Sequence, residues 1–445
     1  MRSAATLLAA IAALLFAPEA LAQKAPSVLK PKPDMFAYTM QKGDNLYTLA
    51  GRYFLHLSDY RAVQGLNRIA NPRRIPVGKV IGIPVRLLRV ELLSARLVAA
   101  RGDVRAWNGA RILPVSTGMA LPIGTAVETG ANGFLTIELP NGSRTTLPTR
   151  SRIVIRQLRR FLLGGAIDYD LEVGAGKAET EATPLGPGKG DLRVRTPRAV
   201  SAVRGTRFRV GYDGEQTSAE VLEGVVGVGA GNDPSEAVEA GFGARIASNG
   251  QIREEALLPP VDLVDPGKVQ IDDEVDLQLN AVAEASAYHV QIGKDAGFVD
   301  VVADLLVVQP DARFANIANG NWFVRATAIS QSGLEGLYQT YSMKRRLTGL
   351  SASAEGSSDT LRFRWNGAGE GWRVYRFQMM RADPATLPIV DEGGLGNEGL
   401  ELHHFEPGIY YWRVGVRQFA MEGSQVEMTE KWLPFEKLIV APQGK

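Results

Sequence analysis

The side chains that most often carry chemistry are scarce in this chain. Among its 445 residues there are four histidines and no cysteine, which removes thiolate nucleophiles, disulfides and cysteine-held zinc. His403 and His404, followed by Glu406, have the composition of a metal-ligand group. Adjacent residues of an extended segment point to opposite sides, so we interpret these three residues as a turn before a strand rather than a metal site.

Three acids alternate along one apparent strand, at Asp168, Asp170 and Glu172. Alternation places them on one face of the strand, as the paired carboxylates of a glycosidase would require. Nothing nearby indicates a pocket, and pairing with arginine-rich strands is the simpler account. The Gly-x-Ser-x-Gly and His-Glu-x-x-His motifs and a phosphate-binding loop are also missing. We therefore expect a non-enzymatic protein with no catalytic residues, metal or cofactor.

Arginines alternate along several of the expected strands. Alternation gathers them on one face, where they would either bind anions or form an ordinary solvated surface, and both interpretations stay open. The formal net charge of +2 argues against nucleic acid as the main partner. The arginines concerned are Arg150, Arg152, Arg156, Arg159, Arg160, Arg193, Arg195, Arg207 and Arg209.

The first residues have the pattern of an export signal. Arg2 precedes an apolar run from Ala4 to Ala17, and Ala20-Leu21-Ala22 supplies small residues for cleavage. The run is shorter than the roughly 20 residues that span a bilayer. We predict a signal peptide at 1–22, cut after about Ala22, with no transmembrane span afterwards and a periplasmic location. A Pro/Lys linker at 23–35 follows.

The segment 36–85 is predicted to fold in the order β-α-α-β. Leu46, Leu49, Ala50 and Tyr53 recur at helical spacing, with Asp44 placed as the N-cap residue. Ser58 is the expected cap of the second helix. This unit is the only place where we expect appreciable helix.

From 92 to 230 the pattern changes to short alternating runs broken by Gly, Pro and Asn. Asn141-Gly142 between two such runs predicts a hairpin. Thr183–Gly190 is expected to be a flexible loop within this β-rich domain. A connecting segment at 231–258 should follow it.

The remaining sequence contains an internal repeat. Tyr288, Gln291 and the segment 320–325 have counterparts in Tyr375, Gln378 and the segment 408–413. The two copies are 259–346 and 347–445, joined through Leu347–Ser358. Each is long enough to hold several alternating strands and close its own core, so we predict two tandem β-sandwiches. Trp412 should lie in the core of the second. The predicted fold class is therefore mainly β and multi-domain, with one small β-α-α-β unit, a β-rich domain and two sandwiches.

Two loops of the unit at 36–85 carry Gly43-Asp44-Asn45-Leu46, then Asn71-Pro72 and Val77-Gly78-Lys79. In these residues the unit resembles the LysM family, although Asn45 replaces a threonine and Val77-Gly78-Lys79 replaces Pro-Gly-Gln. The resemblance implies binding of N-acetylglucosamine-containing glycans such as peptidoglycan in a shallow groove between the two loops. The candidate glycan-binding residues are Gly43, Asp44, Asn45, Leu46, Tyr47, Asn71, Pro72, Arg73 and Ile75.

The physical requirements of such a site agree with the resemblance. An uncharged sugar needs backbone hydrogen-bonding groups and an apolar wall. Gly43 allows close approach of the backbone, and Leu46 and Ile75 are the expected wall. The alternative is that these residues form only the turn, the cap and the core.

The β-rich region carries Thr196-Pro197 followed by Val203-Arg204-Gly205-Thr206-Arg207-Phe208. These residues resemble the FecR domain family, which occurs in periplasmic parts of iron-transport signalling regulators and in exported multi-module proteins. The regulators' cytoplasmic segment and transmembrane helix have no counterpart here, so direct control of a sigma factor is not expected. Gly408–Val414 in turn resembles a core strand of fibronectin type III or Ig-like sandwiches.

Three functional hypotheses follow. The first is a wall-tethered adaptor that binds peptidoglycan and an unidentified envelope protein. The second is a periplasmic signalling component that acts through the FecR-like domain. The third is a cell-wall remodelling enzyme with an unrecognised site, which zymography would reveal.

Overall fold

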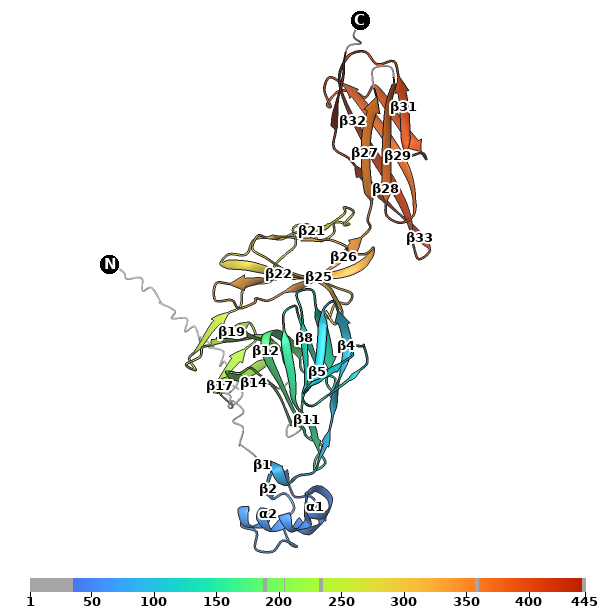
Figure 1. The fold of residues 1–445 in the computed structure, drawn as a ribbon. Coiled ribbons are helices and arrows are strands. Elements are labelled where there is room, and N and C mark those ends of the chain that lie inside the picture. Colours follow the sequence, from blue (N-terminus) through green and yellow to red (C-terminus); the bar gives the residue numbers. More distant parts are fainter. Residues whose placement is uncertain (1–34, 187–189, 204, 232–234, 357–359, 442–445) are drawn as a thin grey trace, which may run out of the picture.

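The computed structural model describes residues 35–186, 190–203, 205–231, 235–356 and 360–441. The predicted signal peptide and all of the linker except Met35 lie outside the described residues. The protein is mainly β, as predicted, and its units form an elongated row (Figure 1). The small helical unit lies at one end of this row, and the last sandwich lies at the other.

The helical unit has the predicted β-α-α-β order. It consists of β1 (Met35–Thr39), α1 (Leu46–Tyr53), the 3-10 helix η1 (Leu57–Asp59), α2 (Tyr60–Leu66), β2 (Val80–Pro84) and η2 (Val85–Leu87), with β1 and β2 antiparallel. The expected helical face of α1 is buried.

Both predicted caps of this unit need correction. The N-cap of α1 is Asn45, whose side chain accepts hydrogen bonds from the backbone of Tyr47 and Thr48. Asp44 lies one residue outside the helix. Ser58 does not cap α2, because it lies inside η1, and Asp59 takes the N-cap position of α2 without a side-chain hydrogen bond. Adjacent Asp and Asn are both good caps, so the sequence left the position ambiguous.

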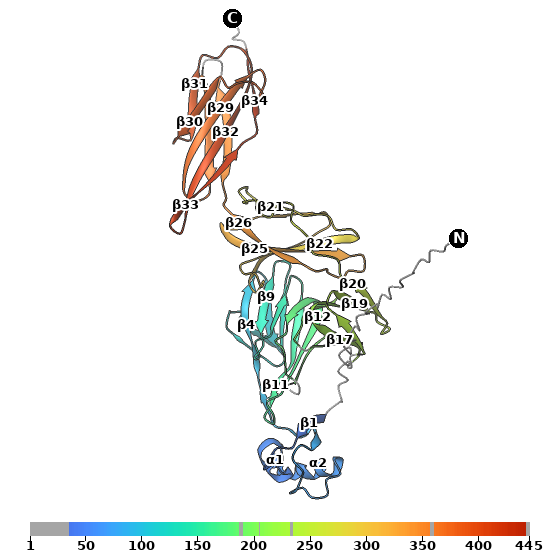
Figure 2. The same ribbon diagram turned by 180° about the vertical axis from the view of Figure 1, so that it is seen from behind.

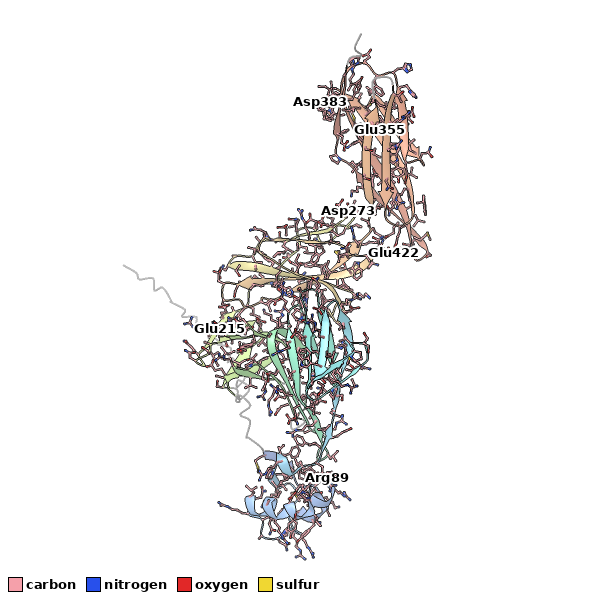
Figure 3. All side chains as sticks on the ribbon, in the orientation of Figure 1. Arg89, Glu215, Asp273, Glu355, Asp383 and Glu422 are labelled. Carbon is pink, nitrogen blue, oxygen red and sulfur yellow. The ribbon has the colours of Figure 1, made fainter. Side chains whose placement is uncertain are left out.

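The helical unit is packed against the next unit rather than tethered loosely to it. Phe161 and Leu163, from a hairpin of the β-rich region, belong to its hydrophobic core, and the rings of Phe36 and Phe161 lie 5.5 Å apart. The backbone of Arg89 donates to Tyr53 and accepts from Leu162. Figure 3 labels Arg89 at this junction.

The second unit is a continuous hydrogen-bonded set of strands that closes on itself around one large core. Its strands are β3 (Val90–Leu92), β4 (Ser94–Arg101), β5 (Val104–Asn108), β6 (Arg111–Leu113), β7 (Ala120–Pro122), β8 (Thr125–Thr129), β9 (Phe134–Glu138), β10 (Arg144–Leu147), β11 (Arg152–Phe161), β12 (Ile167–Glu181), β13 (Gly190–Arg195), β14 (Ala199–Val203), β15 (Arg207–Tyr212), β16 (Thr217–Glu223), β17 (Val225–Ala230), β18 (Glu236–Glu239), β19 (Phe242–Ile246) and β20 (Ile252–Ala256).

Two predictions for this unit can be compared with its strands. The Asn141-Gly142 hairpin is confirmed, because β9 and β10 pair antiparallel with Glu138 opposite Arg144. The connecting segment expected at 231–258 is wrong, since β18, β19 and β20 lie there and extend the same sheets. These strands are only four or five residues long and lack a clear apolar alternation, which concealed them in the sequence. Residues 187–189 of the expected loop Thr183–Gly190 lie outside the described residues.

Most of the alternating arginines face acids on neighbouring strands. Arg156 pairs with Glu172, Arg159 with Asp168, and Arg195 with Asp170. The pairing account of Asp168, Asp170 and Glu172 is therefore confirmed.

The first sandwich has a two-stranded and a four-stranded sheet. Its strands are β21 (Val275–Gln278), β22 (Ala285–Gly293), β23 (Val301–Val307), β24 (Asp311–Phe314), β25 (Gly320–Ser330) and β26 (Gln339–Arg345). In both views its four-stranded sheet lies against the second unit, residues 90–256, which we call the FecR-like unit (Figures 1 and 2).

The second sandwich repeats this plan with longer strands. They are β27 (Gly349–Gly356), β28 (Thr360–Ala368), β29 (Trp372–Arg381), β30 (Val390–Leu395), β31 (Gly399–His403), β32 (Gly408–Glu422), β33 (Gln425–Trp432) and β34 (Glu436–Val440). Trp412 is buried between the two sheets, as predicted, against Phe363 and Phe377. The link expected at Leu347–Ser358 is mostly strand β27; residues 357 and 358 lie outside the described residues.

Candidate functional site

The two loops predicted to form a glycan groove lie side by side. The backbone N–H of Leu46 donates to the carbonyl of Pro72 at 2.9 Å, which ties the loop before α1 to the loop after α2. Gly43 has a φ of +92°, a conformation that favours glycine, and no atom lies within 4 Å of the place of a Cβ. A hollow of about 250 Å³ lies beside it, lined in part by Thr48 and Arg52.

Three of the predicted site residues already have structural roles within the unit. The carboxylate of Asp44 accepts hydrogen bonds from the Tyr38 hydroxyl at 2.7 Å and from the Gln41 backbone at 2.8 Å. Asn45 caps α1. Leu46 is fully buried, so it belongs to the core and cannot form a wall for a sugar, which corrects that expectation.

Two predicted site residues of the second loop, Asn71 and Ile75, also have structural roles. Asn71 accepts a hydrogen bond from the backbone of Arg73 at 2.9 Å and so shapes the turn. Ile75 is half-buried and packs against the core of the unit. Gly43, Tyr47 and Arg73 therefore remain the best-placed of the predicted residues to contact a ligand.

Tyr47 is part of an aromatic platform that the sequence did not reveal. Its ring centroid lies 4.3 Å from that of Tyr60, and the two hydroxyls are 3.3 Å apart. The guanidinium of Arg73 lies 5.3 Å from the Tyr47 ring centroid, and that of Arg61 lies 5.8 Å from the Tyr60 ring centroid. We call Tyr47, Tyr60, Arg61 and Arg73 the aromatic platform.

The hydrogen bond between the two hydroxyls also shifts the pKa values of the two tyrosines in opposite directions. Donation from Tyr47 to Tyr60 raises the pKa of Tyr47 and lowers that of Tyr60, and Arg61 lowers the pKa of Tyr60 further. The platform therefore offers ring faces, hydroxyls and two cations.

The helical unit is strongly basic although the chain as a whole is nearly neutral. Its two acids are already engaged, Asp44 with Tyr38 and Asp59 with the backbone of His56. Among the described residues, none of the unit's eight basic side chains forms an ion pair. They are Lys42, Arg52, Arg61, Arg68, Arg73, Arg74, Lys79 and Arg86.

A second concentration of polar groups lies between the FecR-like unit and the first sandwich. Glu179 of β12 binds Arg209 of β15 at 3.2 Å and Arg325 of β25 at 3.0 Å. Lys177 binds Glu220 at 3.3 Å and Glu335 at 3.0 Å. These side chains join the two units through charges that are mostly buried, with Lys177 the most exposed of them at 27%.

His289 in β22 is held between two acids in the same interface. It lies 2.9 Å from Asp304 and 2.7 Å from Glu335. Burial alone would lower the pKa of His289, but the two carboxylates outweigh burial and raise the pKa to about 10. Burial likewise opposes ionisation of Glu179, yet Arg325 and Arg209 lower its pKa to about 2. His289 and Glu179 are therefore both charged at neutral pH, and the network acts as a connector.

The described part of the chain contains no group of three or more His, Cys, Asp or Glu residues arranged to hold a metal. The His403 ring contacts Thr360, and its centroid lies 6.3 Å from that of His404. No helix within the described ranges is both long and apolar enough to cross a membrane.

Comparison with known families supports the two main resemblances. The LysM domain family model matches residues 38–84, and the FecR protein family model matches residues 125–227. The chain therefore carries a LysM domain and a FecR domain. No curated protein matches the chain.

Three similar solved structures each cover part of the chain. A protein described as an anti-sigma factor from Parabacteroides distasonis is 20% identical over 29% of this chain and 59% of its own, with a TM-score of 0.24. A two-domain fibronectin type III segment of chicken tenascin is 13% identical over 40% and 98%, with a TM-score of 0.19. Fibronectin-like modules of Clostridium thermocellum CbhA are 10% identical over 40% and 93%, also with a TM-score of 0.19. At these TM-scores the likenesses carry no argument about this chain.

Proposed function

We propose that this chain is a non-enzymatic adaptor of the cell envelope that binds peptidoglycan through its LysM domain. The observation that carries the proposal is the aromatic platform beside the paired loops. Sugar rings pack well on aromatic faces, and the hydroxyls and Gly43 backbone supply the few polar contacts that a shallow glycan site needs. The periplasmic location belongs to the same proposal.

The basic character of the LysM domain supports peptidoglycan over a neutral glycan. Peptidoglycan strands carry carboxylates on their stem peptides, and arginine without an ion-pair partner attracts such groups. Arg61 lies over the Tyr60 ring and Arg73 over the Tyr47 ring, so a strand that contacts both rings would pass both cations.

The expected affinity is weak for a single contact. A shallow site gives a Kd in the millimolar to micromolar range, about −4 to −8 kcal/mol, because little surface is buried against the entropy of association. A polymer with many equivalent sites retains such a binder through rebinding. One LysM domain is therefore sufficient for retention at the wall.

The experiment is co-sedimentation of the purified mature protein with insoluble peptidoglycan. Arg73→Ala and Tyr47→Ala should reduce the bound fraction without changing the melting temperature, and Gly43→Val should reduce it through both blocked approach and backbone strain. Arg86→Ala removes the same charge from η2, outside the two loops, and should bind as the wild type does. Binding that survives all three site variants and disappears in high salt would move the anchor to another basic surface.

The adaptor half of the proposal rests on how the units are joined. The LysM domain packs on the β11–β12 hairpin through Phe161, and the FecR-like unit joins the first sandwich through Glu179. The second sandwich stands farthest from the LysM domain (Figure 1). The chain would thus present its last unit, at a distance from the wall, to an envelope protein.

A second candidate is a periplasmic signalling component, favoured by the FecR match at residues 125–227. It differs from the adaptor in requiring that occupancy of one unit changes another. Hydrogen exchange in the FecR-like unit with and without peptidoglycan fragments distinguishes the two. A change in that unit on binding supports signalling, and an unchanged pattern supports the adaptor. Clearing of peptidoglycan in a zymogram would contradict both.

A further inference from the structure

The internal repeat extends to a polar ladder on the outer face of each sandwich. In the first sandwich the Arg325 guanidinium donates to Gln291 at 2.7 Å, and the Gln291 amide donates to Asp304 at 2.8 Å. These residues lie side by side on β25, β22 and β23, because Arg325 is opposite Gln291 and Gln291 is opposite Asp304. We call this row the first ladder.

The second sandwich repeats the ladder residue by residue. Arg413 donates to Gln378 at 2.9 Å, and Gln378 donates to Asp391 at 3.3 Å. The registers of β32, β29 and β30 place the three residues side by side in the same order. This row is the second ladder.

The arginines of the two ladders have the same aromatic surroundings. The Arg325 guanidinium lies 4.5 Å from the ring centroid of Phe298 and 4.6 Å from that of Tyr338. Arg413 lies 4.5 Å from Trp432 and 4.4 Å from Phe435. In each sandwich the arginine is thus held flat and pre-oriented on the outer face of a sheet.

The two ladders differ in how far neighbouring residues bury them. Arg325 also binds the carboxylate of Glu179 in the FecR-like unit, and its side chain is 7% exposed. Arg413 has no ion pair with any described residue. The Asp391 side chain is 29% exposed, against 6% for Asp304. The same surface that joins two units in the first sandwich faces solvent in the second.

The surroundings of the second ladder also have the composition of an interface. Trp372 stacks on Phe419 and is 51% exposed, and Met421, Val426 and Met428 are each more than half exposed on β32 and β33. Their register places all five on one face. On the same face a hollow of about 250 Å³ lies between Arg376 and Trp432, and Asp391 of the ladder is part of its lining. Adjacent exposed apolar residues with a polar row at their edge are typical of protein-binding surfaces.

We propose that the outer face of β29, β32 and β33 is the docking surface for a folded envelope protein that presents a carboxylate to Arg413, in the way that Glu179 meets Arg325. The proposal deepens the adaptor half of the proposed function and rests on it, but it does not depend on binding to peptidoglycan. A second copy of this chain is a poorer occupant, because its Glu179 is already covered by its own first sandwich.

The test is site-specific photocrosslinking of the full-length chain in its own cells. Benzoylphenylalanine replaces Met428 on the docking face, and a control places it at Arg364, on the other sheet of the same sandwich. We expect one discrete protein product from position 428 only, with the crosslink mapped by mass spectrometry beside an acidic residue of the product. Arg413→Glu should reduce its yield by about tenfold or more, since reversing a charge at an interface disfavours the partner strongly. Arg362→Glu, a charge reversal on β28, should leave the yield unchanged.

Two controls keep the outcome decisive. Arg376→Glu alters an exposed residue of the same face, so it tests the surface even where Arg413→Glu lowers the melting temperature. Co-sedimentation with peptidoglycan should be normal in both variants, which separates failure of docking from failure of wall binding. No product at position 428, an equal product at position 364, a product indifferent to both charge reversals, or a product made of two copies of this chain would each overturn the proposal.

Discussion

The two sandwiches carry the same ladder in opposite environments. In the first, Arg325 and Asp304 are enclosed by the FecR-like unit; in the second, Arg413 and Asp391 face solvent. Hydrogen bonds within each ladder are alike, so the sandwich itself builds the row. The covering unit then adds a carboxylate on one side. The same row of polar groups therefore joins two units where another unit covers it, and forms an exposed surface where none does.

The difference also shows what burial demands of charged groups. Removing ions from water costs several kcal/mol for each ion unless partners compensate. The first ladder meets this demand with Glu179, Glu335 and Lys177, all supplied at the junction. In the second ladder Asp391 is paired with the partly exposed Arg376, whereas Arg413 has no carboxylate partner among the described residues and is only partly covered by Trp432 and Phe435. Arg413 therefore stays hydrated until a partner supplies the missing carboxylate.

The largest expected effect concerns the cores beneath the ladders. Trp412→Ala should destabilise the second sandwich by about 3–5 kcal/mol, because a large buried aromatic leaves a cavity beside Phe363 and Phe377. The matching position of the first sandwich is Val324, a smaller buried residue, and Val324→Ala should cost less. Calorimetry that resolves the separate transitions measures both. Equal losses would show that the two cores do not differ as their side chains indicate.

The next effect separates the covered ladder from the exposed one. Glu179→Gln should destabilise the junction by about 3–5 kcal/mol, since it leaves Arg209 and Arg325 buried without a compensating charge. Asp391→Asn, which neutralises an exposed acid in the second ladder, should change melting little. Urea unfolding monitored by proteolysis of each sandwich reports the difference. Similar stability of both variants would mean that the junction charges are hydrated.

Alkaline pH should loosen the first ladder and spare the second. The pKa of His289 is raised to about 10, so its stabilising effect is complete below the unfolded value near 6.5 and is lost as the pH rises through about 10. The corresponding residue of the second sandwich is Arg376, which stays charged. We expect the first sandwich to become protease-sensitive above about pH 10.

The variant His289→Gln isolates this group from the Lys177 and Tyr338 groups that also titrate at high pH. It should be less stable at neutral pH and should lose much of the alkaline step. An alkaline profile identical to that of the wild type would exclude His289 as its source.

The smallest expected effect concerns the junction between the sandwiches. Lys344 and Arg346 at the end of β26 meet Glu422 and Glu427 of the β32–β33 hairpin, and Figure 3 labels Glu422 there. These groups are partly exposed, so salt screens them. Small-angle scattering should show a modestly broader range of interdomain angles at 1 M than at 0.1 M salt. The variant Glu422→Gln with Glu427→Gln should show that breadth already at low salt.

Much of the fold could be predicted from local pattern. The helical spacing from Leu46 to Tyr53, the Asn141-Gly142 turn and the repeat that includes Arg325 and Arg413 each depend on residues close in sequence. The adjacent candidates Asp44 and Asn45 left the cap ambiguous, and the short strands β18–β20 were concealed because they lack an apolar run. Leu46 was misassigned to the site because helical spacing does not separate core from rim.

The candidate sites required long-range packing that no spacing encodes. Tyr60 reaches Tyr47 only because α2 crosses α1, and Glu179 reaches Arg325 across 146 residues. The repeat indicated Gln291 and Gln378 as equivalent but gave no sign that one would be covered. Burial of the first ladder depends on packing of the neighbouring FecR-like unit, which local sequence patterns do not encode.

The most direct measurement is carboxyl labelling of the two equivalent acids, Asp304 and Asp391, with a water-soluble carbodiimide and mass spectrometry. In the purified full-length protein, Asp391 should be labelled and Asp304 protected. In intact cells Asp304 should stay protected, and Asp391 should become protected as well, because a partner then covers the second ladder. Equal labelling of both acids in the purified protein, or labelling of Asp391 that is as strong in cells as in the purified protein, would contradict the account.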